Sequence, residues 1–459
     1  MSDWQEAEQR AERAHELYER GRWAEALSEL RRAIAINPDN GAWHFNLGLT
    51  LDMMDRYDEA LAAYQRAVKL DPQDIESLIA AGADCTRVGQ YQKAIELFER
   101  VERIDASVEA CYCDRIAAYS ELGDFDRAEE MFYLARQYRE KCPLCFYNMG
   151  LALFSRGRYD RALWCWQQVL EMEGDYPQVH ARMADVFWAK GRLPEARTHL
   201  IEELRSDPGN LDTLLDLGEL LMEMGQETAA GEKFRQVLDL DPNECTAHYQ
   251  LGVLAQKVGD WRLALERFKF VLRQDRHFIG AHLQIAQVYY QRNNIPEALY
   301  HGNCELAQPE LDDATLLELG NLFMDMSQYE SAQAAMRRLV AQAPHNADAR
   351  HGLAVAMLLA NRLEEGIEQC KLALKIQPKH SSAMFNLTLA YMSKHDFARA
   401  RYWIQEALDI APDDAQLRQV QQRLWLASHW DQLRQWPKLI LGAIVRLSRK
   451  FNKIQTPPR

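Results

Sequence analysis

"ALSELRRAIAINPDN", residues 26–40, decides the fold, because its pattern returns along the chain at a fixed interval. The stretch "ALAAYQRAVKLDPQD" (60–74) repeats it 34 residues later, and "ALDIAPDD" (407–414) closes the series. Divided from Ala7 onward, the chain gives twelve consecutive repeats of 34 residues without insertion or deletion. A fixed period of this length is typical of an architecture built from one repeated supersecondary unit.

Four positions within the repeat explain what that unit is. Position 20 is alanine in eleven repeats and glycine, Gly366, in the remaining one. Position 8 is a small residue in most repeats. Position 15 is glycine in seven repeats, and position 32 is proline in seven repeats. Small residues at 8 and 20 let two helices cross closely, glycine at 15 supplies a left-handed turn, and proline at 32 ends the second helix. Bulky residues at position 24, such as Tyr64, Phe98 and Trp166, fill the space around the crossing.

These motifs resemble the tetratricopeptide repeat (TPR) family over residues 7–414. The resemblance implies an all-α fold, a right-handed superhelical solenoid of helix-turn-helix repeats in which each repeat contacts mainly its neighbours. We expect a lead-in at 1–6, a capping helix at 415–436 and a basic amphipathic tail at 437–459. Repeat 9 carries Gly302 where a bulky residue is expected, which predicts a weak second helix. Repeats 3–5 and 8 lack proline at position 32, which predicts unusual junctions.

In the TPR family, positions 2, 5, 9 and 12 of the first helix, flanked by 6 and 13, line a concave groove. Many of these positions are apolar in this chain, where a solvated face would be polar. Two interpretations stay open, namely partial burial between adjacent first helices and contact with a ligand. The apolar groove candidates are Phe45, Leu49, Tyr147, Leu151, Trp188, Tyr249, Tyr290 and Phe385.

Position 6 adds side-chain amides, which can donate to a peptide C=O and accept from an N–H at once. The pattern resembles the asparagine ladder in the repeat region of the O-linked N-acetylglucosamine transferases, although it is interrupted here; simple surface polarity is the alternative. The carboxylate clamp for chaperone C-termini requires lysine at position 5, which never occurs, so chaperone tails are disfavoured. The amide candidates are Asn46, Asn148, Gln250, Gln284 and Asn386.

The tail "KLILGAIVRLSRKFNKI" (438–454) places apolar residues at 4-3-4-3 spacing and basic residues mostly on the remaining arc. Residues 429–459 carry a net charge of about +6, against about −20 on the rest of the chain. Such a helix can lie on an anionic membrane, dock on a partner or pack on its own solenoid, and all three alternatives remain open. The candidate membrane or partner contacts are Arg446, Arg449, Lys450 and Lys453.

Candidate chemistry is confined to cysteines. The chain has no glycine-rich phosphate loop, HExxH pair or nucleophile elbow, and His44, His180, His248 and His282 fall at position 4, where packing is expected. A CxC…CxxC set can supply four thiolates to zinc, and its CxxC can form a redox pair, but stacked helices do not readily bring four sulfurs to one point. We therefore expect no metal and no cofactor. The four cysteines are Cys111, Cys113, Cys142 and Cys145.

Bulk composition narrows the function classes. A net charge of −14 argues against nonspecific nucleic-acid binding. Neither a secretory signal nor a run of eighteen apolar residues is visible, and nine cysteines in a long chain do not indicate a disulfide framework, so we expect a cytoplasmic protein. We predict a non-enzymatic scaffold or adaptor that binds a peptide or protein segment in the groove. The alternatives are a peripheral membrane-associated assembly factor anchored by the tail, and a metal or redox sensor.

Overall fold

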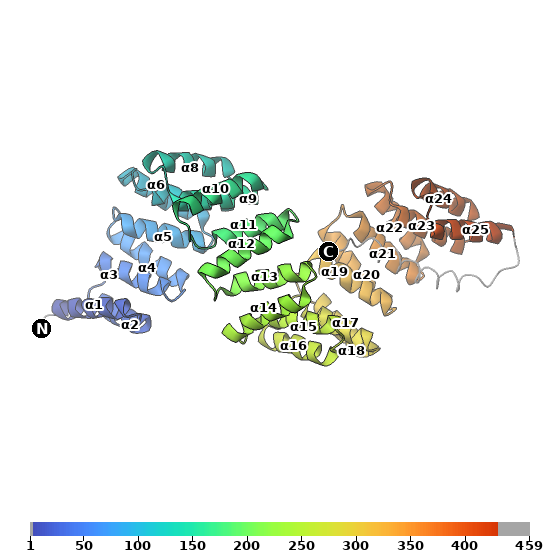
Figure 1. The fold of residues 1–459 in the computed structure, drawn as a ribbon, viewed down its shortest axis with the longest axis horizontal. Helices are drawn as coiled ribbons and strands as arrows, with labels where there is room; N and C mark the ends of the chain where they lie inside the picture. The colour runs from blue at the N-terminus through green and yellow to red at the C-terminus, as the bar shows by residue number, and fades with distance from the viewer. Residues whose placement is uncertain (1–2, 430–459) are drawn as a thin grey trace. The chain divides into compact units, whose positions relative to one another are not determined.

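The computed structural model describes residues 3–429, which form a succession of helices joined by short turns (Figure 1). The described chain divides into two compact bodies, an N-terminal body up to Leu220 and a C-terminal body from Leu221 onward. The last part of the predicted capping helix (430–436) and the whole predicted basic tail (437–459) lie outside the described residues. None of the described helices is both long and apolar enough to cross a membrane.

Each predicted repeat contributes two helices. The first helices are α1 (Asp3–Glu19), α3 (Gly41–Asp52), α5 (Ile75–Arg87), α7 (Ala110–Glu121), α9 (Pro143–Ser155), α11 (Val179–Ala189), α13 (Leu211–Glu223), α15 (Cys245–Lys257), α17 (Ala281–Gln291), α19 (Asp313–Asp325), α21 (Ala347–Leu359) and α23 (Ser381–Ser393). The second helices are α2 (Trp23–Ile36), α4 (Tyr57–Leu70), α6 (Tyr91–Ile104), α8 (Phe125–Tyr138), α10 (Tyr159–Met172), α12 (Leu193–Ser206), α14 (Glu227–Leu240), α16 (Trp261–Gln274), α18 (Ile295–Leu306), α20 (Tyr329–Gln342), α22 (Leu363–Ile376) and α24 (Phe397–Ile410). A last helix, α25 (Ala415–His429), packs on α24. The predicted all-α repeat fold is confirmed.

In most hairpins the core is the contact between positions 8 and 24. A Cβ atom added at Gly150 would lie 2.3 Å from Nε1 of Trp166, and one added at Gly82 would lie 2.6 Å from the ring of Phe98. Both rings have no exposed surface. The ring of the second helix therefore occupies the volume that a side chain at position 8 would need, which holds the two helices at close approach.

The turn between the helices has the same backbone conformation in all twelve repeats. The seven glycines at position 15 have φ between 67° and 81°. The other five repeats place non-glycine residues there with φ between 57° and 63°: Asp55, Asn293, Ser327, Asn361 and His395. Short polar side chains tolerate this left-handed conformation better than branched ones, so the turn persists where the glycine signal is missing.

The junctions after repeats 5 and 8 depart from the common pattern, as the missing prolines predict. Helices α11 and α17 begin at position 3 of their repeats, after the left-handed residues Gln178 and Gly280. A buried carboxylate replaces the usual cap. Glu203 accepts from the N–H groups of Gln178 (2.8 Å) and Ala181 (3.2 Å). The carboxylate of Glu305 accepts from the equivalent N–H groups of Gly280 and Leu283. A negative charge at a helix N-terminus satisfies free donors and complements the helix dipole.

The prediction of a weak second helix in repeat 9 concerns α18. Helix α18 forms, although it is two residues shorter than the other second helices. The space left by Gly302 is taken by Phe323 of the following repeat, whose ring would lie 2.9 Å from a Cβ at Gly302. Phe323 is fully buried. A ring from the next repeat thus replaces the ring that this repeat lacks.

We predict that removing a position-24 ring destabilises the repeat array by about 3–5 kcal/mol, the usual cost of truncating a large buried side chain. Trp166→Ala tests this, because Trp166 has no exposed surface. Trp164→Ala is a matched control on the same helix, since Trp164 is 52% exposed, and we expect a change below about 1 kcal/mol. Urea unfolding followed by circular dichroism measures both, and equal losses would contradict the assigned core.

Candidate functional site

The candidate site is the inner face, which we define as positions 5, 6, 9, 12 and 13 of the first helices. Within the N-terminal body α5, α7, α9 and α11 contact one another in turn, and α15, α17, α19, α21 and α23 do so in the C-terminal body. Second helices of neighbouring repeats make no comparable contact in the described chain. First helices therefore lie closer together than second helices and line the inside of the local curve.

The apolar candidates of the N-terminal body are partly exposed and partly packed. Phe45 and Leu49 lie on α3 against the buried core, and the Phe45 ring is 5.7 Å from that of Tyr64. Tyr147 and Leu151 lie on α9 in the same way. Trp188, at position 12 of α11, is also half-buried. Their partial burial fits the packing interpretation, and contact with a ligand stays a prediction.

The two asparagine candidates of this body differ in environment. Asn46 is half-buried on α3. Asn148 is buried, and its Nδ2 donates to the backbone oxygen of Cys113 at 2.8 Å. The amide nitrogen of Asn148 is thus used to join α9 to α7. Tyr147 beside it donates its hydroxyl to Gln178 Oε1 at 3.2 Å.

In the C-terminal body, Tyr249 is a half-buried aromatic candidate on α15. Its ring lies 5.6 Å from Phe268 and 5.3 Å from Phe278, and its hydroxyl is hydrogen-bonded to Gln284. Burial raises the pKa of Tyr249 to about 12, so its hydroxyl stays protonated and available as a donor. Gln250 and Tyr290 are half-buried at positions 6 and 12 of their helices.

A pocket of about 520 Å³ opens on the inner face between α15 and α17. Its lining is rich in glutamine amides. Gln256 Nε2 donates to Gln287 Oε1 at 3.4 Å, and Gln287 Nε2 donates to Glu318 Oε2 at 3.3 Å. The buried Oε1 of Gln256 has no hydrogen-bond partner among the described residues. The pocket is lined by Val253, Gln256, Lys257, Trp261, Gln284, Gln287 and Gln291.

Sequence reasoning found Gln284 but missed Gln256 and Gln287. These residues occupy positions 12 and 9 of the stripe that the sequence had already outlined. The sequence analysis considered side-chain amides only at position 6, and at positions 2, 5, 9 and 12 it considered only apolar residues. Polar residues on the stripe were the signal that could have found them.

The remaining candidates, Phe385 and Asn386, lie on α23 and are buried, at 3% and 2% exposure. Asn386 Nδ2 is 2.7 Å from Nε2 of His351 on α21. The structure therefore places these two residues within a packed part of the C-terminal body. The basic candidates Arg446, Arg449, Lys450 and Lys453 lie outside the described residues.

Two of the histidines at position 4, His180 and His282, are paired with a histidine at position 23 of the same repeat. His180 Nδ1 is 3.1 Å from His199 Nδ1 in repeat 6, and His282 Nδ1 is 2.8 Å from His301 Nδ1 in repeat 9. Burial lowers the pKa of His301 to about 4. A neutral pair can form a hydrogen bond between one N–H and one lone pair, so packing of this kind matches the sequence interpretation.

An acidic cluster borders the inner face in repeats 2 and 3. Asp52 accepts from the Tyr64 hydroxyl at 2.7 Å, and Asp84 pairs with Arg87 at 2.8 Å. The side chain of Asp84 has no exposed surface, and its Oδ2 has no partner among the described residues. Burial, with the nearby charge of Asp52, raises the pKa of Asp84 to about 7.

Three of the four clustered cysteines come together between α7 and α9. Cys113 and Cys145 form a disulfide, and Cys142 Sγ lies 3.4 Å from Cys113 Sγ. The three sulfurs lie within 4.8 Å of one another and are buried. Cys111 is not part of this group, and its thiol donates to the Val108 oxygen. The predicted redox pairing of Cys142 with Cys145 is therefore wrong: the pair is Cys113 with Cys145.

Comparison with known proteins agrees with this architecture. A family model described as tetratricopeptide repeat matches residues 11–75, 113–179, 181–244, 249–307, 317–381 and 373–415. A comparison with curated protein sequences finds no match.

Several solved structures are similar to this chain at low identity. A thermophilic TPR protein of Thermus thermophilus is 24% identical, with 40% of this chain and 100% of that chain covered and a TM-score of 0.38. A tetratricopeptide repeat protein of Parabacteroides merdae is 18% identical over 55% and 99%, with a TM-score of 0.47. Yeast Tom70 is 13% identical over 98% and 99%, with a TM-score of 0.41.

The raised pKa of Asp84 predicts a pH dependence of stability. The folded chain retains a proton that the unfolded chain releases between about pH 4 and pH 7, so the free energy of unfolding falls as the pH rises through that window. We expect Asp84→Asn, which cannot ionise, to be more stable than the wild type at about pH 8, by on the order of 1 kcal/mol, and to lose this advantage near pH 5. Urea unfolding midpoints at the two pH values measure the effect. Parallel pH profiles of the two proteins would refute it.

Proposed function

This chain belongs to the tetratricopeptide repeat family, whose repeats build protein–protein interaction scaffolds, and we propose that its inner face binds an extended or helical segment of another protein. The single observation that carries the proposal is the glutamine-lined pocket between α15 and α17. It combines an opening of suitable size, donors and acceptors for a peptide backbone, and a neighbouring aromatic side chain.

The polar groups of the pocket suit a polypeptide ligand. Gln256, Gln287 and Glu318 form a chain of hydrogen bonds across three successive first helices, 31 residues apart in each step. The Oε1 atom of Gln256 is buried and has no partner among the described residues, and a rotation of the side chain would present it to a peptide N–H. A buried acceptor without a partner costs about 1–3 kcal/mol, and a ligand that donates to it recovers that amount.

Aromatic side chains supply the apolar part of the proposed contact. Tyr249 lies on the same first helix as Gln256 and is held by its hydrogen bond to Gln284. Gly280 is required beside it, because a Cβ there would lie 2.9 Å from the Tyr249 hydroxyl oxygen. A rigid tyrosine offers contact area at low conformational cost, which is a common feature of protein-binding surfaces.

Substitutions in the pocket test the proposal. We expect the double variant Gln256→Ala, Gln287→Ala to weaken capture of the protein partner by about tenfold or more, since each lost hydrogen bond to a ligand contributes about 1 kcal/mol. Capture from lysate of the source cells, quantified by mass spectrometry and followed by titration of the recovered partner, measures the change.

Tyr300→Ala is the matched control, because Tyr300 is 62% exposed on the second helix α18. Circular dichroism of all variants verifies folding. Equal affinity of the double variant and the control for the same partner would exclude the pocket as the binding surface.

A second candidate function, a thiol-based redox sensor, is favoured by the three adjoining sulfurs of Cys113, Cys142 and Cys145. Oxidation of the Cys113 and Cys145 thiols to the disulfide transfers two electrons and two protons to a peroxide, which gives two molecules of water when the oxidant is hydrogen peroxide. The Cys142 thiolate can then attack Cys113 and release Cys145 as a thiolate. Burial raises the pKa of Cys142, so this attack requires a local opening that admits a base.

Reduction and reoxidation of the full chain test the sensor. We expect the Cys113–Cys145 linkage to be found by mass spectrometry after peroxide treatment, and its reduction to lower the free energy of unfolding by about 4 kcal/mol, given a closed loop of this length. Cys165→Ser, a buried cysteine outside the cluster, should behave as the wild type. Stoichiometric zinc in the reduced protein, lost in Cys142→Ser, would assign the cluster to a metal instead.

A further inference from the structure

A second pocket, of about 520 Å³, lies in the N-terminal body and takes no part in the inner face. It opens between α4 and α6, the second helices of repeats 2 and 3, and is called the outer pocket below. Both helices pack on α5, but within the described chain they do not pack closely on each other. A gap therefore remains between them, with the first helix α5 beneath it.

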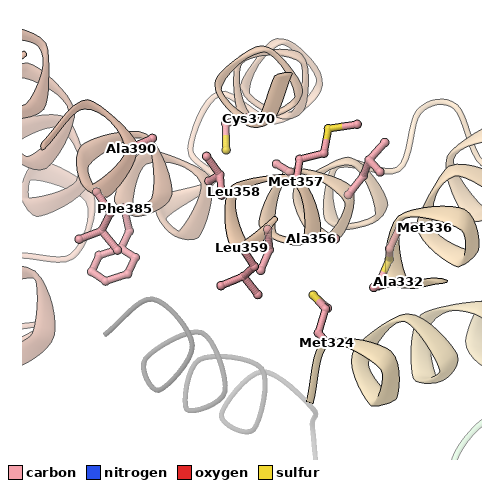
Figure 2. Close-up of a cluster of buried hydrophobic side chains, with 14 of the residues drawn as sticks. Met324, Ala332, Met336, Ala356, Met357, Leu358, Leu359, Cys370, Phe385 and Ala390 are labelled. Atoms are coloured by element: carbon pink, nitrogen blue, oxygen red, sulfur yellow. The ribbon is translucent and has the colours of Figure 1, made fainter. Parts of the chain in front are cut away.

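Helix α5 carries two small residues beneath this gap, where other first helices carry large ones. Position 7 is Leu, Ile, Met or Arg in the other eleven repeats and Ala81 in repeat 3. Position 11 is Cys85 here, and elsewhere only Ala255 is comparably small. Figure 2 shows one of the large residues, Met357 at position 11 of α21, within the buried cluster of the C-terminal body. Less side-chain volume thus stands on α5 at the place where the outer pocket lies.

The deeper part of the outer pocket is apolar. Val68 of α4 is buried and Leu97 of α6 is half-buried, and both line the pocket beside Ala81 and Cys85. Burial raises the pKa of the Cys85 thiol, so this side chain is uncharged at neutral pH. The pocket therefore offers a surface for a hydrocarbon group.

Three cationic side chains surround this apolar part: Lys69 on α4, and Lys93 and Arg100 on α6. The hydrogen bonds that hold two of them go to neutral groups. Lys93 Nζ donates to Gln90 Oε1 at 2.8 Å, and Arg100 Nη2 donates to the backbone oxygen of Pro72 at 3.0 Å. Only one carboxylate, that of Glu96, lines the same pocket. The positive charge at the rim is thus not balanced by the lining.

The preceding junction shows how such a gap can be bridged instead. Between repeats 1 and 2, Arg31 at position 25 pairs with Glu59 at position 19, at 3.1 Å. The equivalent positions between repeats 2 and 3 hold Gln65 and Lys93, which cannot form an ion pair. Both residues line the outer pocket. The ion pair that joins neighbouring second helices is therefore replaced here by an open, basic rim.

Cations around an apolar hollow match a ligand that combines the opposite charge with an apolar body. The whole chain has a net charge of −14, so a local excess of cations favours an anion at this site over the rest of the surface. A guanidinium group donates two parallel hydrogen bonds to a carboxylate, and an ammonium group adds a point charge. The pocket volume lies within the range of about 300–1,000 Å³ that is usual for small-molecule sites.

We propose that the outer pocket binds a small amphiphilic anion, a molecule with one hydrocarbon chain and a carboxylate head group. The chain contacts Val68 and Leu97, and the carboxylate accepts hydrogen bonds from Lys93 and Arg100. The proposal goes beyond the proposed function, because it concerns another face of the repeats and another class of ligand. Partner binding to the inner face and anion binding to the outer pocket are measured separately, so either can fail alone.

Calorimetric titration of the full-length protein with decanoate, below its micelle concentration, tests the site. We expect one decanoate per chain, and we expect Arg100→Gln to weaken its affinity by about tenfold or more, because a charge-assisted hydrogen bond is lost. Arg103→Gln is the matched control on the same helix. Arg103 is exposed, is not part of the pocket lining, and donates to the backbone oxygen of Glu99. Its loss should leave the affinity unchanged.

Two further measurements separate the head group from the apolar chain. 1-Decanol, which has the same chain without a charge, should bind at least about tenfold more weakly than decanoate. Ala81→Leu, which restores the side chain common at position 7, should abolish decanoate binding although every cation is kept. Circular dichroism verifies the fold of each variant, and the comparison of Arg100→Gln with Arg103→Gln decides alone if Ala81→Leu does not fold.

Three results would overturn the proposal. The first is the absence of saturable decanoate binding to the wild type. The second is equal affinity of Arg100→Gln and Arg103→Gln, which would place the bound anion elsewhere on the chain. The third is equal affinity for decanoate and 1-decanol, which would reduce the site to an apolar depression without a role for its cations.

Discussion

The close approach of two helices at position 8 is the constraint on which the rest of the structure depends. A glycine or alanine on the first helix leaves no room except for the ring that the second helix inserts at position 24, as Gly150 and Trp166 show. This contact fixes which face of the first helix is covered by its own hairpin partner. The opposite stripe is left to face the inside of the curve, so the candidate binding surface is a geometric result of the core packing.

The fold could be predicted almost completely from the sequence because its signals are local and repeated. The site could not, because its geometry arises between repeats. Gln256 and Gln287 become one hydrogen-bonded pair only when α15 and α17 are placed side by side. Cys145 pairs with Cys113 and not with Cys142, which lies only three residues before it in the sequence. This pairing likewise depends on how α7 packs against α9. The ring of Phe323 fills the space beside Gly302 although the two residues belong to different repeats. No sequence pattern within a single repeat predicts this contact.

Conformation also persists where its sequence signal is absent. Five turns keep a positive φ with Asp, Asn, Ser or His in place of glycine. The surrounding helix packing imposes the left-handed conformation at a modest local cost, and the residue types that occur there are mostly those that tolerate it. The inner face shows the converse behaviour. Its residues vary widely between repeats, from Tyr147 to Gln287, although some of them pack one edge against the hairpin core, as Phe45 does against Tyr64. A surface that is free to vary on a constant frame is well suited to recognising a specific partner.

The buried carboxylates of Glu203 and Glu305 reveal a second, longer order in the chain. They are three repeats apart, and each accompanies a left-handed residue, a first helix of eleven residues and a histidine pair. Within the described chain, the three repeats between these two joints therefore form one cassette whose borders carry the same joint. A loss or duplication of one cassette of 102 residues, the separation of Glu203 from Glu305, would join two equivalent borders with the carboxylate cap intact. The chain could therefore gain or lose 102 residues at a time without requiring a new kind of contact between repeats.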